Sequence, residues 1–153
     1  MKLLNTLIIL CTMLALTGTA AAQQPDGAQR ADSVDWEPVI YAIMQIESGG
    51  HLNAVNGPYV GPLQIAPVMV RECNNILRQR GSAKRFQLSD RRSLEKSKEM
   101  FLLIMSKYNP QNDIDKACRI WKMGIGYTIK GTQSFVNRVH RIMEERRRAA
   151  EAE

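Results

Sequence analysis

The feature that most constrains this chain is an amphipathic stretch that stops at two adjacent glycines. The apolar positions of the stretch recur at intervals of three and four residues: Val39, Ile40, Ile43 and Met44. That period predicts a helix with one buried face. Glu47 continues this face, and Gly49 and Gly50 place it in the last turn, because glycine favours the end of a helix. The sequence therefore predicts a carboxyl group on the apolar side of a helix end.

The surroundings predicted for Glu47 suit proton transfer. Apolar neighbours disfavour the charged carboxylate, and so does the negative end of the helix dipole. A carboxyl group that stays partly protonated near neutral pH can act as a general acid. The alternative is a solvated or structural glutamate, which is the commoner role of such a residue.

The rest of the chain indicates a mainly α domain with one small irregular lobe. Further helices are expected over Pro67 to Gln79, Ser93 to Tyr108, Asn112 or Asp113 to Trp121, and from about Gln133 onward. The segment from His51 to Pro62 is rich in Asn, Gly and Pro, which predicts a loop or a small irregular sheet. A second loop is indicated by three glycines: Gly124, Gly126 and Gly131.

The N-terminal residues predict export. Residues 1–22 read as a signal peptide, with Lys2 before an apolar stretch and small residues at a cleavage site. Residues 23–33 are polar and predict a flexible lead-in, residues 34–143 the folded domain, and residues 144–153 a charged C-terminal tail that frays. The mature protein is therefore expected in the periplasm or outside the cell. No integral membrane segment is expected after signal cleavage.

The chain is basic. It has 21 Lys and Arg residues against 15 Asp and Glu residues, a formal net charge of +6. A basic exported protein suits an anionic partner such as cell wall, a membrane surface or nucleic acid, and a solvated face that aids solubility explains the charge equally well. The sequence has no zinc-ligand spacing, no Gly-rich phosphate loop and no aromatic–basic pattern of a nucleic-acid module. We therefore expect no metal, no cofactor and no nucleic acid.

Two cysteines follow the signal peptide, Cys73 and Cys118. Each falls on the apolar face of a predicted helix. Export permits a disulfide between them, but spacing along the chain does not show whether their backbones approach closely enough. Two separate buried thiols are the alternative.

Side chains that can contact a saccharide follow Glu47 along the chain. The candidates are Asn53, Asn56, Tyr59, Gln64, Trp121 and Tyr127. Amide groups can bind sugar hydroxyl and N-acetyl groups through paired donors and acceptors, and aromatic faces can pack against sugar rings. Each residue alone is a weak indication, since Asn is an ordinary loop former and Trp121 occupies a core-like helix position.

Taken together, these segments resemble a known enzyme family. Glu47-Ser48 followed by Gly61-x-x-Gln64-Ile65 is similar to motifs of the lytic transglycosylases in the lysozyme-like superfamily. Those enzymes carry a Glu-Ser pair, then Gly-Leu-Met-Gln-Ile, then Ala-Tyr-Asn-Ala-Gly. The resemblance covers about residues 34–143.

The resemblance implies a helical lysozyme-like fold with a small β-lobe beside a saccharide cleft. It implies that Glu47 is the general acid and base, that Ser48 helps to hold the substrate and Glu47, and that Gln64 lines the cleft. The implied partner is the glycan strand of peptidoglycan. Small exported enzymes of this type often serve a secretion, conjugation or phage machine that must cross the wall.

Two motifs depart from the family pattern. Pro62 stands where the family usually has Leu, which should stiffen the turn and leave Gln64 in register. Trp121-Lys122-Met123-Gly124 occupies the place of Tyr-Asn-Ala-Gly. Lys122 brings a cation near the expected site, which would favour ionised Glu47. We expect Lys122 at the cleft edge, either in contact with an anionic part of the substrate or turned into solvent.

The absence of a second acid favours a lyase. The segment from Ser48 through Arg71 contains no Asp or Glu, whereas most glycoside hydrolases use two carboxylates. One acid suffices if the substrate supplies the nucleophile. The resemblance thus implies cleavage of the MurNAc–GlcNAc β-1,4 bond with formation of 1,6-anhydro-muramyl ends. A muramidase that uses water, and a non-catalytic wall-binding or assembly protein on the same fold, are the alternatives.

Overall fold

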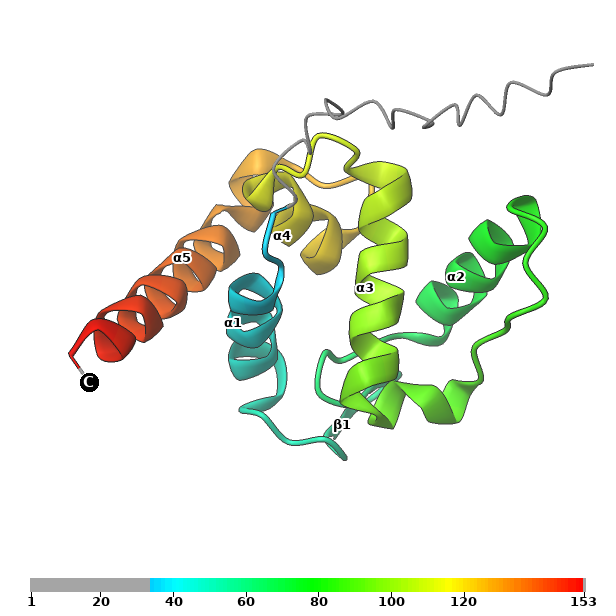
Figure 1. Cartoon of the computed structure of the whole chain (residues 1–153), viewed down its shortest axis with the longest axis horizontal. Coiled ribbons are helices and arrows are strands. Elements are labelled where there is room, and N and C mark those ends of the chain that lie inside the picture. The colour runs from blue at the N-terminus through cyan, green and yellow to red at the C-terminus, as the bar shows by residue number, and fades with distance from the viewer. Residues whose placement is uncertain (1–33, 153) are drawn as a thin grey trace, which may run out of the picture. The chain divides into compact units, whose positions relative to one another are not determined.

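The computed structural model describes residues 34–152, so the signal peptide and lead-in expected over residues 1–33 lie outside the described residues. Within this part the chain is mainly helical, as expected, with one short hairpin (Figure 1). The elements are α1 (Glu37–Ser48), β1 (Val55–Asn56), β2 (Tyr59–Val60), α2 (Pro67–Gln79), the 3-10 helix η1 (Leu88–Arg92), α3 (Leu94–Tyr108), α4 (Ile114–Met123) and α5 (Ile129–Glu151). No helix within these bounds is long and apolar enough to cross a bilayer.

The helices share one apolar core. α1 and α4 both pack against α5, and α2 packs against α3. An aromatic row joins three segments: the Phe101 ring of α3 lies 5.6 Å from the Trp36 ring before α1 and 5.1 Å from the Trp121 ring of α4, measured between centroids. Because Trp121 is fixed in this way, the core sets the position of α4 relative to the start of α1.

The sequence signals for the helix ends are present in the structure. Gly49 follows α1 in the left-handed region, with φ 61°, which glycine adopts without a steric penalty. The Ser93 side chain accepts a backbone N–H at the start of α3, and the Asp113 side chain does the same for α4. Asp113 rather than Asn112 is therefore the cap of α4.

The start of α5 differs from the prediction. The helix begins at Ile129, one turn before the expected start near Gln133. The Thr128 hydroxyl accepts a hydrogen bond from the Gly131 N–H at 3.1 Å, which caps the helix. Gly131 therefore lies in the first turn, and the expected loop ends before it. The cap offsets the low helix propensity of glycine.

The end of α5 corrects the expected frayed tail. The helix continues through Glu151. Glu144 accepts hydrogen bonds from Arg147 at 2.8 Å and from Arg148 at 2.7 Å, and Arg147 also pairs with Glu151. Pairs three and four residues apart stabilise an exposed helix by roughly 0.2–0.5 kcal/mol each. The tail is thus a charged helical extension.

The two cysteines are free and buried, so the structure contains separate thiols and no disulfide between them. Cys73 lies on α2, where its thiol is 3.7 Å from the Met100 carbonyl oxygen of α3. Cys118 lies on α4, which packs against α5. The two helices thus have different packing partners. Burial raises the pKa of each thiol to about 12.

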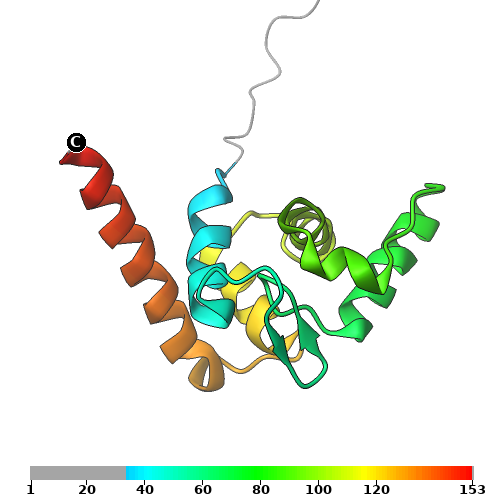
Figure 2. The ribbon, with the colours of Figure 1, turned by 90° about the horizontal axis from the view of Figure 1, so that it is seen from below.

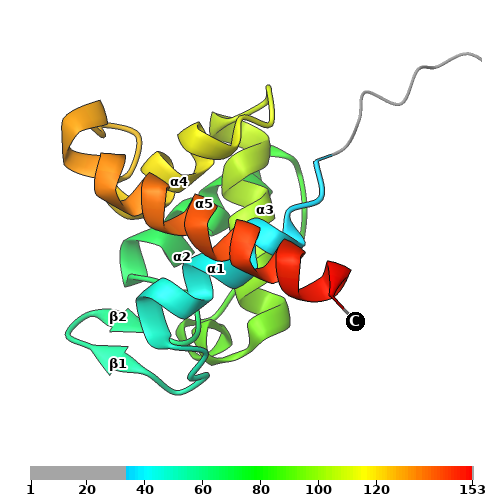
Figure 3. The same ribbon diagram turned by 90° about the vertical axis from the view of Figure 1, so that its left-hand side faces the viewer.

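The segment after α1 is the expected small irregular lobe. β1 and β2 pair antiparallel, with Asn56 opposite Tyr59, and the hairpin lies beside the end of α1 (Figures 2 and 3). Gly61 then turns the chain at φ 85°, and a Cβ at this position would lie 1.6 Å from the Arg91 carbonyl oxygen. Only glycine fits this approach. The turn of the Gly61-x-x-Gln64-Ile65 motif, called the motif turn below, is therefore held against the segment that precedes α3.

Candidate active site

A pocket of about 240 Å³ brings together residues from α1, the hairpin, the turn after it and α4. Its lining residues are Glu47, Asn56, Tyr59, Leu63, Gln64, Trp121 and Lys122. Every one of them except Leu63 is a candidate from the sequence. Segments as far apart as the first and fourth helices therefore meet at the expected place.

Glu47 is the one acidic residue that lines this pocket in the described part of the chain. It lies in the last turn of α1, and its side chain is 19% exposed. The Lys122 ammonium lies 3.1 Å from Glu47 Oε1, and the Lys122 side chain is 43% exposed. The same ammonium lies 5.1 Å from the centre of the Phe135 ring. Lys122 is thus directed toward Glu47, and its ammonium engages one of the two carboxyl oxygens.

Ser48 holds the end of α1 to the motif turn. Its hydroxyl lies 2.8 Å from the Pro62 carbonyl oxygen and 3.1 Å from the Met44 carbonyl oxygen, as donor. It does not line the pocket. In the structure the Ser48 hydroxyl thus positions the turn next to Glu47.

Gln64 is held by the turn that it terminates. Its amide nitrogen donates to the Gly61 carbonyl at 2.9 Å and to the Ala54 carbonyl at 3.3 Å. Its φ of 50° is unusual for a residue with a side chain. The hydrogen bonds within residues 34–152 use the amide nitrogen, so the side-chain carbonyl oxygen can accept a hydrogen bond from a sugar hydroxyl or an N-acetyl N–H.

Trp121 serves both the core and the pocket. Its ring is 8% exposed and packs on Phe101. Its indole N–H donates to the Leu63 carbonyl oxygen at 3.3 Å. Trp121 therefore forms a wall of the pocket and also ties α4 to the motif turn. Trp121 thus occupies a core position and lines the pocket at the same time.

One aromatic candidate, Tyr127, and one amide candidate, Asn53, lie outside the pocket lining. Tyr127 is partly buried against the core and does not line the pocket. Asn53 is exposed in the loop before β1. Asn56 and Tyr59 do line the pocket, from the two facing positions of the hairpin. The paired residues of the hairpin thus reach the pocket, whereas Asn53 in the loop before it does not.

Sequence reasoning missed Arg91 as a support of the site. Its guanidinium donates to the Pro58 and Ile65 carbonyl oxygens, each at 3.1 Å, on either side of the motif turn. The sequence shows Arg91 only as part of a basic pair with Arg92. No local pattern marks it, because its partners lie 26 and 33 residues away.

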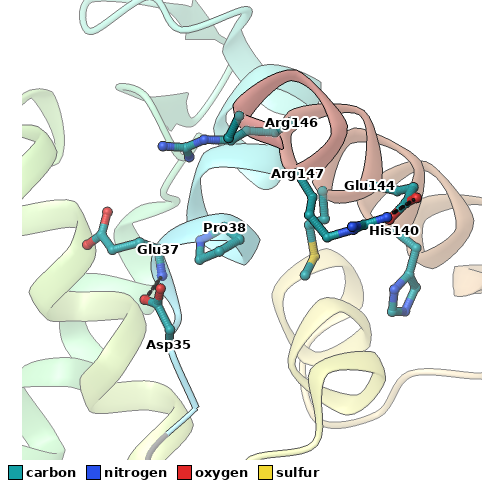
Figure 4. A pocket seen from close by; sticks show the side chains of 9 residues that line it. Asp35, Glu37, Pro38, His140, Glu144, Arg146 and Arg147 are labelled. Atoms are coloured by element: carbon teal, nitrogen blue, oxygen red, sulfur yellow. Dashed lines mark hydrogen bonds and ion pairs between the residues drawn. The ribbon is translucent and has the colours of Figure 1, made fainter. Parts of the chain in front are cut away.

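A larger cavity, of about 620 Å³, lies between the start of α1 and the end of α5 (Figure 4). Two of its three carboxylates form ion pairs: Glu37 with Lys98 at 2.6 Å, and Glu144 with Arg147 and Arg148. The third, Asp35, accepts a hydrogen bond from the Glu37 backbone N–H at 3.0 Å. Hydrogen bonds from the two arginines lower the pKa of Glu144 to about 2. The Glu144 carboxyl is therefore ionised near neutral pH, which does not suit a general acid.

No cluster of three or more His, Cys, Asp or Glu side chains suited to a metal ion occurs among residues 34–152. Comparisons with protein-family models, with curated proteins and with solved structures found no match. The chemistry of this pocket therefore has to be argued from its own residues.

Proposed function

We propose that this protein is an exported peptidoglycan lytic transglycosylase with a lysozyme-like arrangement, in which Glu47 is the single general acid and base. One observation carries the proposal. Within residues 34–152, Glu47 is the one acid that lines the pocket, and it shares the pocket with the amides of Asn56 and Gln64 and with two aromatic side chains, which suits an N-acetylated sugar. The motif similarity of Glu47-Ser48 and Gly61-x-x-Gln64-Ile65 supports the same substrate class.

The reaction needs one proton donor that later becomes an acceptor. Protonated Glu47 gives its proton to the glycosidic oxygen, the bond from this oxygen to C1 of the muramyl sugar breaks, and the leaving sugar departs as its 4-hydroxyl form. The 6-hydroxyl oxygen of the muramyl sugar then attacks C1, and its proton passes to Glu47. The products are a 1,6-anhydro ring and a regenerated acid, and no water is consumed.

The lining of the pocket supports the lyase over a hydrolase with two acids. A hydrolase of that kind places a second carboxylate about 5–9.5 Å from the first. The other residues that line this pocket are amide, aromatic, aliphatic and cationic. The charged group that lies against Glu47 in this pocket is the Lys122 ammonium, at 3.1 Å from Oε1. The substrate's own hydroxyl is therefore the nucleophile that the geometry suits.

The decisive experiment is digestion of purified peptidoglycan by the mature protein, with product masses. Anhydro-muramyl ends are the expected result. Reducing muramyl ends would identify a muramidase. Wall binding without any cleavage would identify a non-catalytic wall-binding protein. The Glu47–Lys122 ion pair favours this second candidate, because its hydrogen bond occupies an oxygen of the proposed acid.

Replacement of the acid tests its role. Glu47→Gln should lower cleavage by roughly 100-fold or more, since a general acid contributes about 10²–10⁴ in rate. The variant should remain folded and bind wall fragments, because glutamine has nearly the same shape. Glu37→Gln is the matched control, since Glu37 lies at the other end of α1 in an exposed pair with Lys98. Cleavage by Glu47→Gln at the rate of this control would show that Glu47 is not the acid.

A further inference from the structure

The ion pair in the pocket conflicts with the first step of the proposed reaction. Glu47 must turn a carboxyl oxygen to the glycosidic bond to act as an acid, yet the Lys122 ammonium lies 3.1 Å from its Oε1. The ammonium donates a hydrogen bond to this oxygen and so competes with the substrate for it. Productive binding therefore requires that the substrate moves Lys122 away from Glu47 or offers it another partner.

The two members of the pair differ in freedom. The Glu47 side chain is 19% exposed at the end of a helix, whereas the Lys122 side chain is 43% exposed at the rim of the pocket. Lysine carries its charge on a flexible four-carbon stem. Lys122 is thus the partner that can turn toward a bound ligand. Glu47 is its one carboxylate partner within residues 34–152.

We propose that Lys122 determines specificity by exchanging Glu47 for a carboxylate of the substrate. The inference rests on the proposed function, because it concerns the same pocket and the same glycan. A muramyl glycan that carries a carboxylate gives the ammonium a new partner and releases the Glu47 oxygen toward the glycosidic bond. A neutral glycan leaves the ion pair in place, so its cleavage is slow.

The exchange is physically favoured over simple separation of the pair. Simple separation of this pair gives up its charge-assisted hydrogen bond. A substrate carboxylate avoids this cost, since Lys122 keeps an anionic partner throughout. The carboxylate can belong to the lactyl group of the muramyl sugar or to its peptide stem. Both present the same chemistry to an ammonium group at the rim.

The cleavage test uses soluble glycan strands in three forms. One form carries its peptide stems, one is stripped by an amidase so that only the lactyl carboxylates remain, and one has its carboxylates converted to neutral amides. The parent protein should prefer a charged form over the neutral form by on the order of tenfold, the effect of one charge-assisted hydrogen bond. The charged form that is preferred identifies the source of the carboxylate.

Lys122→Met should abolish this preference and should cleave the neutral form faster than the parent does. Methionine keeps the apolar stem that lies near the Phe135 ring and removes the charge. Lys122→Arg should retain a preference, since the charge remains. Lys130→Met is the control: it removes one exposed charge from the first turn of α5, outside the pocket lining. An equal preference in Lys122→Met and in the parent would overturn the inference.

Binding in an inactive background separates this inference from the proposed function. Protein with Glu47→Gln should bind charged fragments more tightly than amidated ones, and addition of Lys122→Met should remove the difference, whereas addition of Lys130→Met should not. If Lys122→Met removes this difference in binding but the parent does not cleave the glycan, the proposed function is wrong and the role of Lys122 stands. If the parent cleaves the glycan but the difference in binding does not depend on Lys122, the role of Lys122 is wrong and the proposed function stands.

Discussion

At the scale of the residue, the pocket depends on side chains that serve two purposes. Trp121 packs in the core against Phe101 and also holds the Leu63 carbonyl. Ser48 ends α1 and also holds the Pro62 carbonyl. Such residues couple the geometry around Glu47 to the stability of the domain. Substitutions at these positions will therefore change activity and stability together, whereas Glu47 and Lys122 can be changed with less effect on the fold.

The thiols provide a residue-scale prediction about burial. Since burial raises the pKa of Cys73 and Cys118 to about 12, both remain protonated and poorly nucleophilic near neutral pH. An alkylating reagent should leave both unmodified in the native mature protein and should label both after denaturation without reductant. Mass spectrometry of the two samples checks the expectation. A denatured protein that takes up no label until it is reduced would instead demonstrate a disulfide.

At the scale of the element, the motif turn is the least replaceable part of the site. It is held from one side by Ser48 and Trp121 and from the other by the Arg91 guanidinium. Gly61 permits this close packing, because any side chain there would meet the Arg91 carbonyl oxygen. Hydrogen bonds from three separate segments thus hold Gln64 in an unusual backbone conformation next to Glu47.

A pair of glycine substitutions tests this account of the turn. Gly61→Ala should destabilise the domain by about 2–4 kcal/mol, since the new Cβ would lie 1.6 Å from backbone and φ is 85°. Gly57→Ala is the control, with φ 57° and open space around its Cβ, and should cost about 1 kcal/mol from backbone strain alone. Denaturant unfolding monitored by circular dichroism measures both. Equal losses would show that the approach to Arg91 does not limit the turn.

At the scale of the whole molecule, the excess of positive charge suits an anionic polymer. The formal net charge is +6. Long-range attraction of this kind raises the encounter rate with an anionic wall and is screened by salt. Under the proposed function, the charge would attract the protein to the wall as a whole, while Lys122 would act on one group of the substrate.

Salt dependence tests the contribution of the charge. Binding of the inactive Glu47→Gln protein to insoluble sacculi should weaken as ionic strength rises from roughly 0.05 M to 0.5 M, because the screening length falls below about 5 Å. Co-sedimentation at several salt concentrations measures this dependence. Binding that does not change with salt would show that the wall affinity comes from the pocket alone. The positive residues would then only keep the surface solvated.

The sequence by itself determined the local elements of this protein and most of the residues that line its pocket. The apolar period predicts α1, the glycines after it place Glu47 in the last turn, and Pro67 and Ser93 mark the starts of α2 and α3. These features depend on neighbours within a few residues, so local chemistry is enough to predict them.

The tertiary structure decided how these elements meet. The contact between Glu47 and Lys122 joins residues 75 positions apart, and the orientation of Ser48 toward Pro62 depends on where the motif turn packs. The same packing keeps Tyr127 out of the pocket lining and places the two cysteines in helices with different partners. Such contacts follow from the angles at which helices pack in a shared core, and no local sequence pattern encodes those angles.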